Sequence, residues 1–379
     1  MNRERSCTRK ISMDDYSLKI LKTAQSPNQA LAAALGKVLE QKQVDGVVAP
    51  GKSKDSGLPM PMLFTGSQAI NSCLPLAPVA GVSTAVQAAR LGRNAQKRRL
   101  AVVVKPCELR ALIELAKLNQ TSLDSMVLIC MQCPGRMENS VYLEHLEKNP
   151  DLPDKYLHDS ELQALASPTC LSCDLFEPHG ADLIIHLPGI PVMEQLGISA
   201  PTQAGIELAA AMDLEESGQA LDQAEALTLL REKRSLARQE LFKRTREIIQ
   251  DQDRFPAFLG NCLGCFNCRT ACPVCYCREC VCAREAFDRE LPEIMARADR
   301  SGMARLPAAL GMFHLTRLTH MAHACIGCGQ CSSVCPSGIP VADLFRTLGA
   351  EVQKTLDYSP GRDPEEPIPY LRFKSEAGS

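Results

Sequence analysis

Two stretches of this 379-residue sequence decide its C-terminal fold, CLGCFNCRTACP at 262–273 and CIGCGQCSSVCP at 325–336. Both follow the pattern C-x2-C-x2-C-x3-C-P, and the sequence contains no other internal repeat. Three cysteines at this spacing can wrap a tight loop around three corners of a cubane cluster, while the fourth points away and binds the other cluster. The two stretches therefore predict a pair of [4Fe-4S] clusters that exchange their fourth ligands.

The exchange assigns four cysteines to each predicted cluster. The two ligand sets are Cys262, Cys265, Cys268 and Cys335 for the first cluster, and Cys325, Cys328, Cys331 and Cys272 for the second. Glycines beside the cysteines leave room for backbone N–H groups to approach the sulfurs. Zinc knuckles are the alternative, but zinc sites use two C-x2-C pairs or Cys–His mixtures rather than this run.

Fifty-two residues separate Cys272 from Cys325, which is more than a minimal ferredoxin needs and predicts a helical insert at about 283–322. Four more cysteines stand at the start of this interval, namely Cys275, Cys277, Cys280 and Cys282. Ligands so close together cannot easily cap one cubane unaided. Two alternatives stay open, a further metal or cluster site completed by a partner chain, and buried free or redox-active thiols.

The composition of the whole chain supports metal binding rather than disulfides. Nineteen cysteines in a long chain without an apolar signal segment are typical of metal ligands or redox groups. A hydrophobic fraction of 45% and a charged fraction of 23% are typical of a soluble globular protein. The net charge of -2 gives no reason to expect nucleic acid as a partner, and no apolar run is long enough for a membrane span. We expect a cytoplasmic protein.

Upstream of the cysteine repeats, residues 1–200 alternate short apolar runs with helix-forming segments. The runs that we expect to form strands are 46–50, 100–105, 126–131 and 181–187. Short, continuous, β-branched runs are typical of strands buried on both faces of a sheet. The alternation predicts an α/β domain with a mostly parallel sheet.

Two further segments complete the predicted organisation. Residues 201–256 are rich in Ala, Leu, Glu, Arg and Gln and predict a helical linker with one long helix. Its basic residues can be a docking surface, although a solvated helix face is the simpler explanation. Residues 257–379 are the predicted α+β ferredoxin-like domain with two clusters, a helical insert and an extended Pro-rich tail.

Five cysteines of the first domain lie where ligands gather in α/β proteins. Cys107 follows the second predicted strand at the start of a helix, Cys130 closes the third strand, and Cys133 lies three residues further on. Cys170 and Cys173 form a C-x2-C pair before the fourth strand. Ligands bind at the carboxyl ends of parallel strands. The spacing alone leaves a third [4Fe-4S] cluster and scattered buried cysteines as alternatives.

The segments VVVKPCELRALIELAKL and CLSCDLFEPHGADLIIHLPG resemble the beta subunits of coenzyme F420-dependent hydrogenases and formate dehydrogenases. The resemblance covers roughly residues 15–195 and is most specific at K-P-C before a helix and C-x2-C-D before the last strand. Members of that family bind FAD and hold a [4Fe-4S] cluster beside it. The resemblance implies that the ligands of a third cluster are Cys107, Cys130, Cys170 and Cys173, with Cys133 as a spare.

The resemblance also implies FAD, with coenzyme F420 or NAD(P)H as the hydride carrier. Ser26 and Asn28 open the first helix, where the family's backbone approaches the flavin. Lys105 would stabilise negative charge on the reduced flavin, and the alternative is an ordinary surface lysine. The sequence departs from the family here, because Ser-Pro-Asn-Gln replaces the common Ser-Gly-Gly and Pro27 removes a donor. The GKSKDSG stretch at 51–57 can cradle phosphates or form an ordinary surface loop.

Two functions from different classes fit these features. In a flavin–iron–sulfur oxidoreductase subunit, the flavin splits a two-electron hydride into single electrons, and no side chain needs to act as a general acid or base. In a pure electron-relay and scaffold subunit, the chain carries clusters only. Either would assemble with other redox subunits, such as a hydrogenase, a formate dehydrogenase or a heterodisulfide-reductase-like module. A zinc-bound regulatory protein is a third alternative, and it would be colourless as isolated.

Overall fold

The structure is a computed structural model that describes residues 18–53, 55–93, 98–217, 222–277, 279–283, 291–304 and 310–371. The chain divides into two compact units. The first unit is Met1–Ser235 with Gly361–Pro364, and the second is Leu236–Pro360 with Glu365–Ser379. The boundary falls inside α9 (Ala224–Gln250), which is the long helix predicted for the linker.

An eight-stranded sheet forms the centre of the first unit, in the order β3-β2-β4-β5-β6-β7-β1-β8. The strands are β1 (Lys19–Lys22), β2 (Gly46–Lys52), β3 (Pro59–Phe64), β4 (Leu100–Val104), β5 (Met126–Met131), β6 (Leu183–His186), β7 (Gln195–Ser199) and β8 (Glu215–Glu216). The four predicted strands are β2, β4, β5 and β6, and they are adjacent and parallel. Their carboxyl ends therefore lie along one edge of the sheet.

The sheet as a whole is mixed rather than mostly parallel. Its described residues form three parallel pairings and four antiparallel ones. The antiparallel strands β1, β3, β7 and β8 are the ones that the sequence pattern missed. β3 carries two prolines and β8 has two exposed residues, and both are edge strands, where proline and short length are tolerated.

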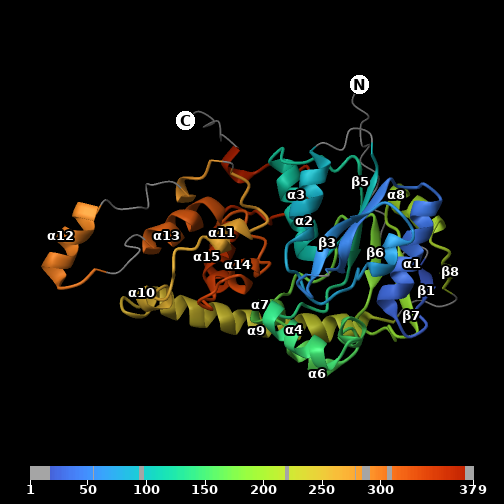
Figure 1. Cartoon of the computed structure of the whole chain (residues 1–379), viewed down its shortest axis with the longest axis horizontal. Coiled ribbons are helices and arrows are strands. Elements are labelled where there is room, and N and C mark those ends of the chain that lie inside the picture. Colours follow the sequence, from blue (N-terminus) through green and yellow to red (C-terminus); the bar gives the residue numbers. More distant parts are fainter. Residues whose placement is uncertain are drawn as a thin grey trace, which may run out of the picture. The chain divides into compact units, whose positions relative to one another are not determined.

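Helices cover both faces of this sheet, as Figure 1 shows within the first unit. α1 (Pro27–Glu40) and α8 (Gln203–Ala210) lie on one face, and α2 (Thr84–Gly92) and α3 (Pro106–Lys117) lie on the other. The remaining short helices of this unit are η2 (Ala69–Ser72), α4 (Asn139–Lys148), α5 (Leu152–Lys155), α6 (Ser160–Ala164) and α7 (Pro168–Leu171).

The main core of the first unit lies under α1 and α8. Leu31 and Leu35 of α1 pack in one cluster with alternate strand residues such as Val103 and Ile129. Side chains alternate between the faces of a strand, so the residues between these, including Cys130, point toward the face that carries α2 and α3. Whether a strand residue faces α1 and α8 or α2 and α3 therefore depends on its odd or even position along the strand.

The described residues of the second unit form helices and loops. The helices are α10 (Arg254–Phe258), α11 (Asn267–Thr270), η3 (Val281–Ala283), α12 (Leu291–Ser301), α13 (Leu310–Met321), α14 (Gln330–Ser333), α15 (Val341–Thr355) and η5 (Pro369–Leu371). α12 and α13 lie within the predicted helical insert. No strand occurs in the described part of this unit, so the β component expected of a ferredoxin-like domain is not found there.

Of the helices that the structure describes, none combines the length and the apolar character needed to cross a bilayer.

Candidate iron–sulfur sites

The two cysteine loops of the second unit have the same backbone conformation. Gly264 and Gly327 occupy the third position of each loop with φ of 66° and 69°. Two residues later, Phe266 and Gly329 have φ of 57° and 75°, and α11 and α14 begin directly after them. These left-handed positions turn the chain tightly enough for successive cysteines to face one centre. The shared spacing therefore produces a shared local fold.

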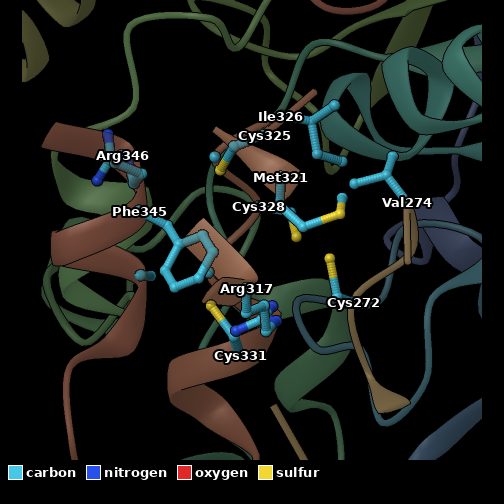
Figure 2. Close-up of a pocket in the computed structure, with 13 residues that line it drawn as sticks. Cys272, Val274, Arg317, Met321, Cys325, Ile326, Cys328, Cys331, Phe345 and Arg346 are labelled. Carbon is cyan, nitrogen blue, oxygen red and sulfur yellow. The ribbon is translucent and has the colours of Figure 1, made fainter. Parts of the chain in front are cut away.

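Four cysteines surround one pocket in the second unit (Figure 2). They are Cys272, Cys325, Cys328 and Cys331, the set predicted for the second cluster. Three come from the second loop and one from the first, as ligand exchange requires. Apolar side chains, including Val274, Ile326 and Phe345, and the two arginines Arg317 and Arg346 form the rest of the lining. The donor set and the apolar walls fit a [4Fe-4S] cluster.

The structure also brings together the set predicted for the first cluster. Burial raises the pKa of Cys268, and the negative charges of Cys262, Cys265 and Cys335 act on it in the same direction. These four thiols therefore lie close enough to repel one another as thiolates. Such repulsion is relieved when thiolates bind a positively charged metal centre.

Hydrogen-bond donors point at two sulfurs of this first set. The ring Nε2 of His314 lies 3.4 Å from Cys262 Sγ, and the N–H of Ile339 donates to Cys335 Sγ at 3.4 Å. Burial, followed by the charge of Arg317, lowers the pKa of His314 to about 4. The imidazole is therefore neutral near pH 7, and its Nε2 tautomer can donate to the sulfur. Donors to sulfur are a known way to adjust cluster potential.

Across the described ranges, no group of three or more His, Cys, Asp or Glu side chains converges on a single ion position. Each thiolate of a cubane binds a different iron, so its ligands stand farther apart than those around one zinc ion.

The additional cysteines after the first loop occur as pairs. The Cys275 thiol hydrogen-bonds to Cys272, and this bond is the main reason why the pKa of Cys272 is lowered to about 6. Burial raises the pKa of Cys282 to about 11, and the neighbouring Cys280 acts in the same direction. Cys275 is thus paired with a predicted cluster ligand, and Cys280 with Cys282, so both alternatives for these cysteines stay open.

In the first unit, Cys170 acts electrostatically on Cys133. Burial raises the pKa of Cys133 to about 11, and the charge of Cys170 is the next largest cause. A side chain at Gly135 would lie 3.4 Å from the Cβ of Cys170, so the loop that follows β5 packs directly on α7. The resemblance to the family implied that Cys133 is not a ligand. In the structure, the loop that contains Cys133 packs beside the pair Cys170 and Cys173.

Cys130 lies inside β5 and is 0% exposed. Its side chain points toward the face of the sheet that carries α3, and burial raises its pKa well above the usual range. Cys107 is the second residue of α3 and is half-buried at the carboxyl edge. A cubane at that edge is reached more directly from Cys133, which lies beyond the end of the strand, than from Cys130.

Sequence reasoning missed the residues that hold the Cys133 loop. Arg234 of α9 donates from Nη1 to the carbonyl of Cys133 at 3.1 Å and from Nη2 to that of Pro134 at 2.8 Å. Its guanidinium also lies 4.9 Å from the ring centre of Phe176, whose carbonyl accepts the Cys133 N–H. Tyr156 is fully buried beside this loop, and its hydroxyl finds no hydrogen-bond partner among the described residues. The sequence pattern predicts that the basic residues of this helix are exposed to solvent. Arg234 differs from that prediction because its side chain is buried.

The side chains predicted to approach a flavin are engaged with protein groups. Ser26 Oγ donates to Asp154 Oδ2 at 2.9 Å, and both the N–H and the Nδ2 of Asn28 donate to Asp154 Oδ1. The Asn28 Oδ1 accepts from the N–H of Leu76 at 2.9 Å, and Asn28 is 0% exposed. The Asp154 carboxylate therefore takes the anion position at the N-terminus of α1. Ser26 and Asn28 do not fit a direct contact with FAD.

Lys105 is better placed for an anionic cofactor. It is buried at the carboxyl end of β4, where its Nζ donates to the carbonyl of Val79 at 3.4 Å and its N–H donates to Glu108 Oε2. Burial raises the pKa of Cys130 and Cys133, and the charge of Lys105 acts in the opposite direction on both. The lysine thus supplies positive charge beside the cysteines at this edge.

The chain is similar to known proteins over most of its length. The chain is 25% identical over 368 residues to the F420-dependent formate dehydrogenase subunit beta of Methanocaldococcus jannaschii, covering 88% of this chain and 92% of the relative. It is 27% identical over 375 residues to the F420-dependent formate dehydrogenase 1 subunit beta of Methanococcus maripaludis, covering 89% and 92%. The chain is therefore similar over nearly its whole length to the beta subunits of F420-dependent formate dehydrogenases.

Two further comparisons concern parts of the chain. A 4Fe-4S dicluster domain matches residues 274–340, a range that includes the second cysteine loop but begins after the first. A solved structure of the F420-reducing [NiFe] hydrogenase complex from Methanosarcina barkeri overlays with a TM-score of 0.45 at 12% identity, covering 60% of this chain and 90% of that one.

Proposed function

We propose that this chain is the electron-transfer beta subunit of an F420-dependent formate dehydrogenase. The observation that carries the proposal is the convergence of Cys272 with Cys325, Cys328 and Cys331 around one apolar pocket. Two relatives of that description match nearly the whole chain, so the cluster module and the α/β unit occur together in them as they do here. A chain that combines both carries electrons between a hydride carrier and a partner's redox centre.

We assign three cluster sites to the chain. Two belong to the exchanged ligand sets of the second unit. The third lies at the carboxyl edge of the sheet in the first unit, and the ligands that its geometry favours are Cys107, Cys133, Cys170 and Cys173. This set replaces Cys130 with Cys133, because Cys133 lies beside Cys170 whereas Cys130 is enclosed within β5.

FAD is the group that would convert the two electrons of a hydride into single electrons. Lys105 would hold positive charge beside it at the carboxyl edge of the sheet, next to the proposed third cluster. Ser26 and Asn28 would act indirectly, by fixing the start of α1 through Asp154. We propose F420 as the hydride carrier and the catalytic subunit of a formate dehydrogenase as the partner, following the description of the two relatives.

One observation favours the alternative of an electron relay without flavin. The N-terminus of α1 is already occupied by the Asp154 carboxylate, so the most obvious anion position of this unit is filled by the protein itself. A relay subunit would need only the clusters and contact with its redox partners.

Anaerobic purification with iron, sulfide and flavin quantified per chain tests both proposals. About twelve irons per chain would support three clusters, and about eight would leave only the pair in the second unit. Bound FAD, together with reduction of F420 by the chain when a viologen supplies electrons, supports the oxidoreductase subunit. Full iron without FAD and without F420 reduction supports the relay. Activity with NAD(P)H in place of F420 would overturn the assignment of the carrier.

A further inference from the structure

Arg317 on α13 is a deeply buried cation in the helical insert between the two cysteine loops. It is 2% exposed, and its guanidinium lies 4.4 Å from the ring centre of Phe345. The group hydrogen-bonds to the sulfurs of Cys272 and Cys275, and its Nε and Nη1 atoms have no hydrogen-bond partner among the described residues. Arg317 also lines the pocket of the second ligand set (Figure 2).

Both predicted ligand sets lie within reach of this charge. Burial raises the pKa of Cys268 in the first set and of Cys331 in the second, and Arg317 is the strongest opposing influence on each. Figure 2 shows Arg317 beside Cys331 and Cys272. The geometry agrees, because Arg317 lines the pocket of the second set while His314, one turn earlier on α13, lies 3.4 Å from Cys262 Sγ of the first.

The charges that act on Arg317 come from cysteines. Burial lowers its pKa, and the thiolates of Cys272, Cys331, Cys268 and Cys275 raise it, so that the net shift is upward. None of the described Asp or Glu side chains forms an ion pair with it. A buried guanidinium without a carboxylate is costly unless another negative group compensates for it. A [4Fe-4S] cluster with four thiolates is such a group, since it carries net negative charge that grows on reduction.

Arg346 is a second buried arginine of the same unit, and unlike Arg317 it has a carboxylate as neighbour. Arg346 is 8% exposed and lines the pocket on the side of Cys325. Burial raises the pKa of Asp343, and the charge of Arg346 acts against this rise, so Arg346 has a carboxylate as neighbour. Arg346 is thus partly neutralised and faces one ligand set, whereas Arg317 faces both.

We propose that Arg317 is a shared charge that raises the reduction potentials of both clusters in the second unit. Positive charge close to a cluster favours its reduced state, because the reduced state carries one more electron. The same charge weakens the repulsion between two reduced clusters, so that each can hold one of the two electrons that a hydride delivers. The inference rests on the proposed function, because it requires that both clusters are bound.

The test is an anaerobic redox titration of the full chain, in which electron paramagnetic resonance follows each cluster. R317Q is expected to keep its iron and to lower both potentials. At a fixed ambient potential, the ratio of reduced to oxidised cluster should fall at least tenfold at each site, which corresponds to about 59 mV for one electron. R317K should keep both potentials close to those of the wild type. R346Q is the matched control and should change only the cluster next to Cys325.

Unchanged potentials in R317Q, or a shift at one cluster only, would overturn the proposal. If R317Q loses its clusters, R317M and R317K decide the matter. Loss in R317M with retention in R317K supports a requirement for charge, and loss in both shows that shape rather than charge is needed. A wild-type chain that lacks iron would instead refute the proposed function, so the two failures are distinguishable.

Discussion

The two cysteine-rich regions of this protein hold their ligands in different ways. In the second unit, each loop presents three cysteines within one short backbone motif, and the two copies share left-handed positions at Gly264 and Gly327. In the first unit, the candidate ligands come from the start of α3, the residues after β5, and α7. The first arrangement is set by local backbone geometry, and the second depends on the sheet bringing distant segments together.

The largest expected effect concerns the exchange of ligands between the two loops. With exchange, Cys335 serves the same cluster as Cys268. The double variant C268A/C335A should therefore lose about four irons, the same as either single variant. C331A/C335A should lose about eight, because it removes a ligand from each cluster. Iron analysis of the anaerobically purified variants gives the result. The opposite pattern would show that each loop binds its own cluster without exchange.

The next prediction examines the less regular region. Cys133→Ala should lose about four irons, because the loop that holds it packs on α7 beside Cys170. Cys130→Ala should keep the full iron content, since its side chain is enclosed within β5. Alanine removes one buried sulfur there, at a cost in stability of about 1–2 kcal/mol. Iron loss in Cys130→Ala with retention in Cys133→Ala would restore the ligand set that the sequence resemblance implied.

Because the second unit holds its ligands locally and the first does not, the sequence predicts the ligand sets of the second unit more completely. The cysteine spacing of the second unit predicts its ligand sets directly, because C-x2-C-x2-C-x3-C dictates a loop conformation. In the first unit, the hydrophobic run at 126–131 predicts β5 with its correct bounds, Met126–Met131. The pattern does not show how the loop after the strand folds, and that loop places Cys133 against α7 through contacts with residues distant in the sequence.

The sequence also did not predict hydrogen bonds between residues that are far apart along the chain. Asn28 was predicted to contact a cofactor from its place at the start of a helix, and its actual partner, Asp154, lies 126 residues away. The antiparallel strands were missed for a related reason. Strands as short as β1 and β8, or as rich in proline as β3, are stabilised by their neighbours in the sheet rather than by their own composition.

A smaller effect should follow from loosening the loop of the first unit from a distance. Arg234→Ala removes two charged hydrogen bonds to the carbonyls of Cys133 and Pro134, with an expected cost of about 2 kcal/mol. We expect the variant to release about four irons to a chelator at least tenfold faster, while the other irons leave at the wild-type rate. The control is Arg231→Ala, one turn earlier on α9, whose ion pair with Glu177 is partly exposed and contributes little. Equal release rates for both variants would show that the loop does not depend on Arg234.

The smallest effect concerns the local geometry that the two loops of the second unit share. Gly329→Ala places a side chain at φ of 75°, which should cost about 1 kcal/mol and lower the thermal midpoint of the holo-protein by about 2–4 °C. The first loop already has a side chain at the corresponding position, where Phe266 packs edge-on against Phe313 at 4.8 Å. Phe266→Gly relieves the left-handed strain but loses an aromatic pair worth about 1 kcal/mol, so its net change should be the smaller of the two. A large loss in Phe266→Gly, with none in Gly329→Ala, would mean that ring packing rather than backbone conformation holds these loops in shape.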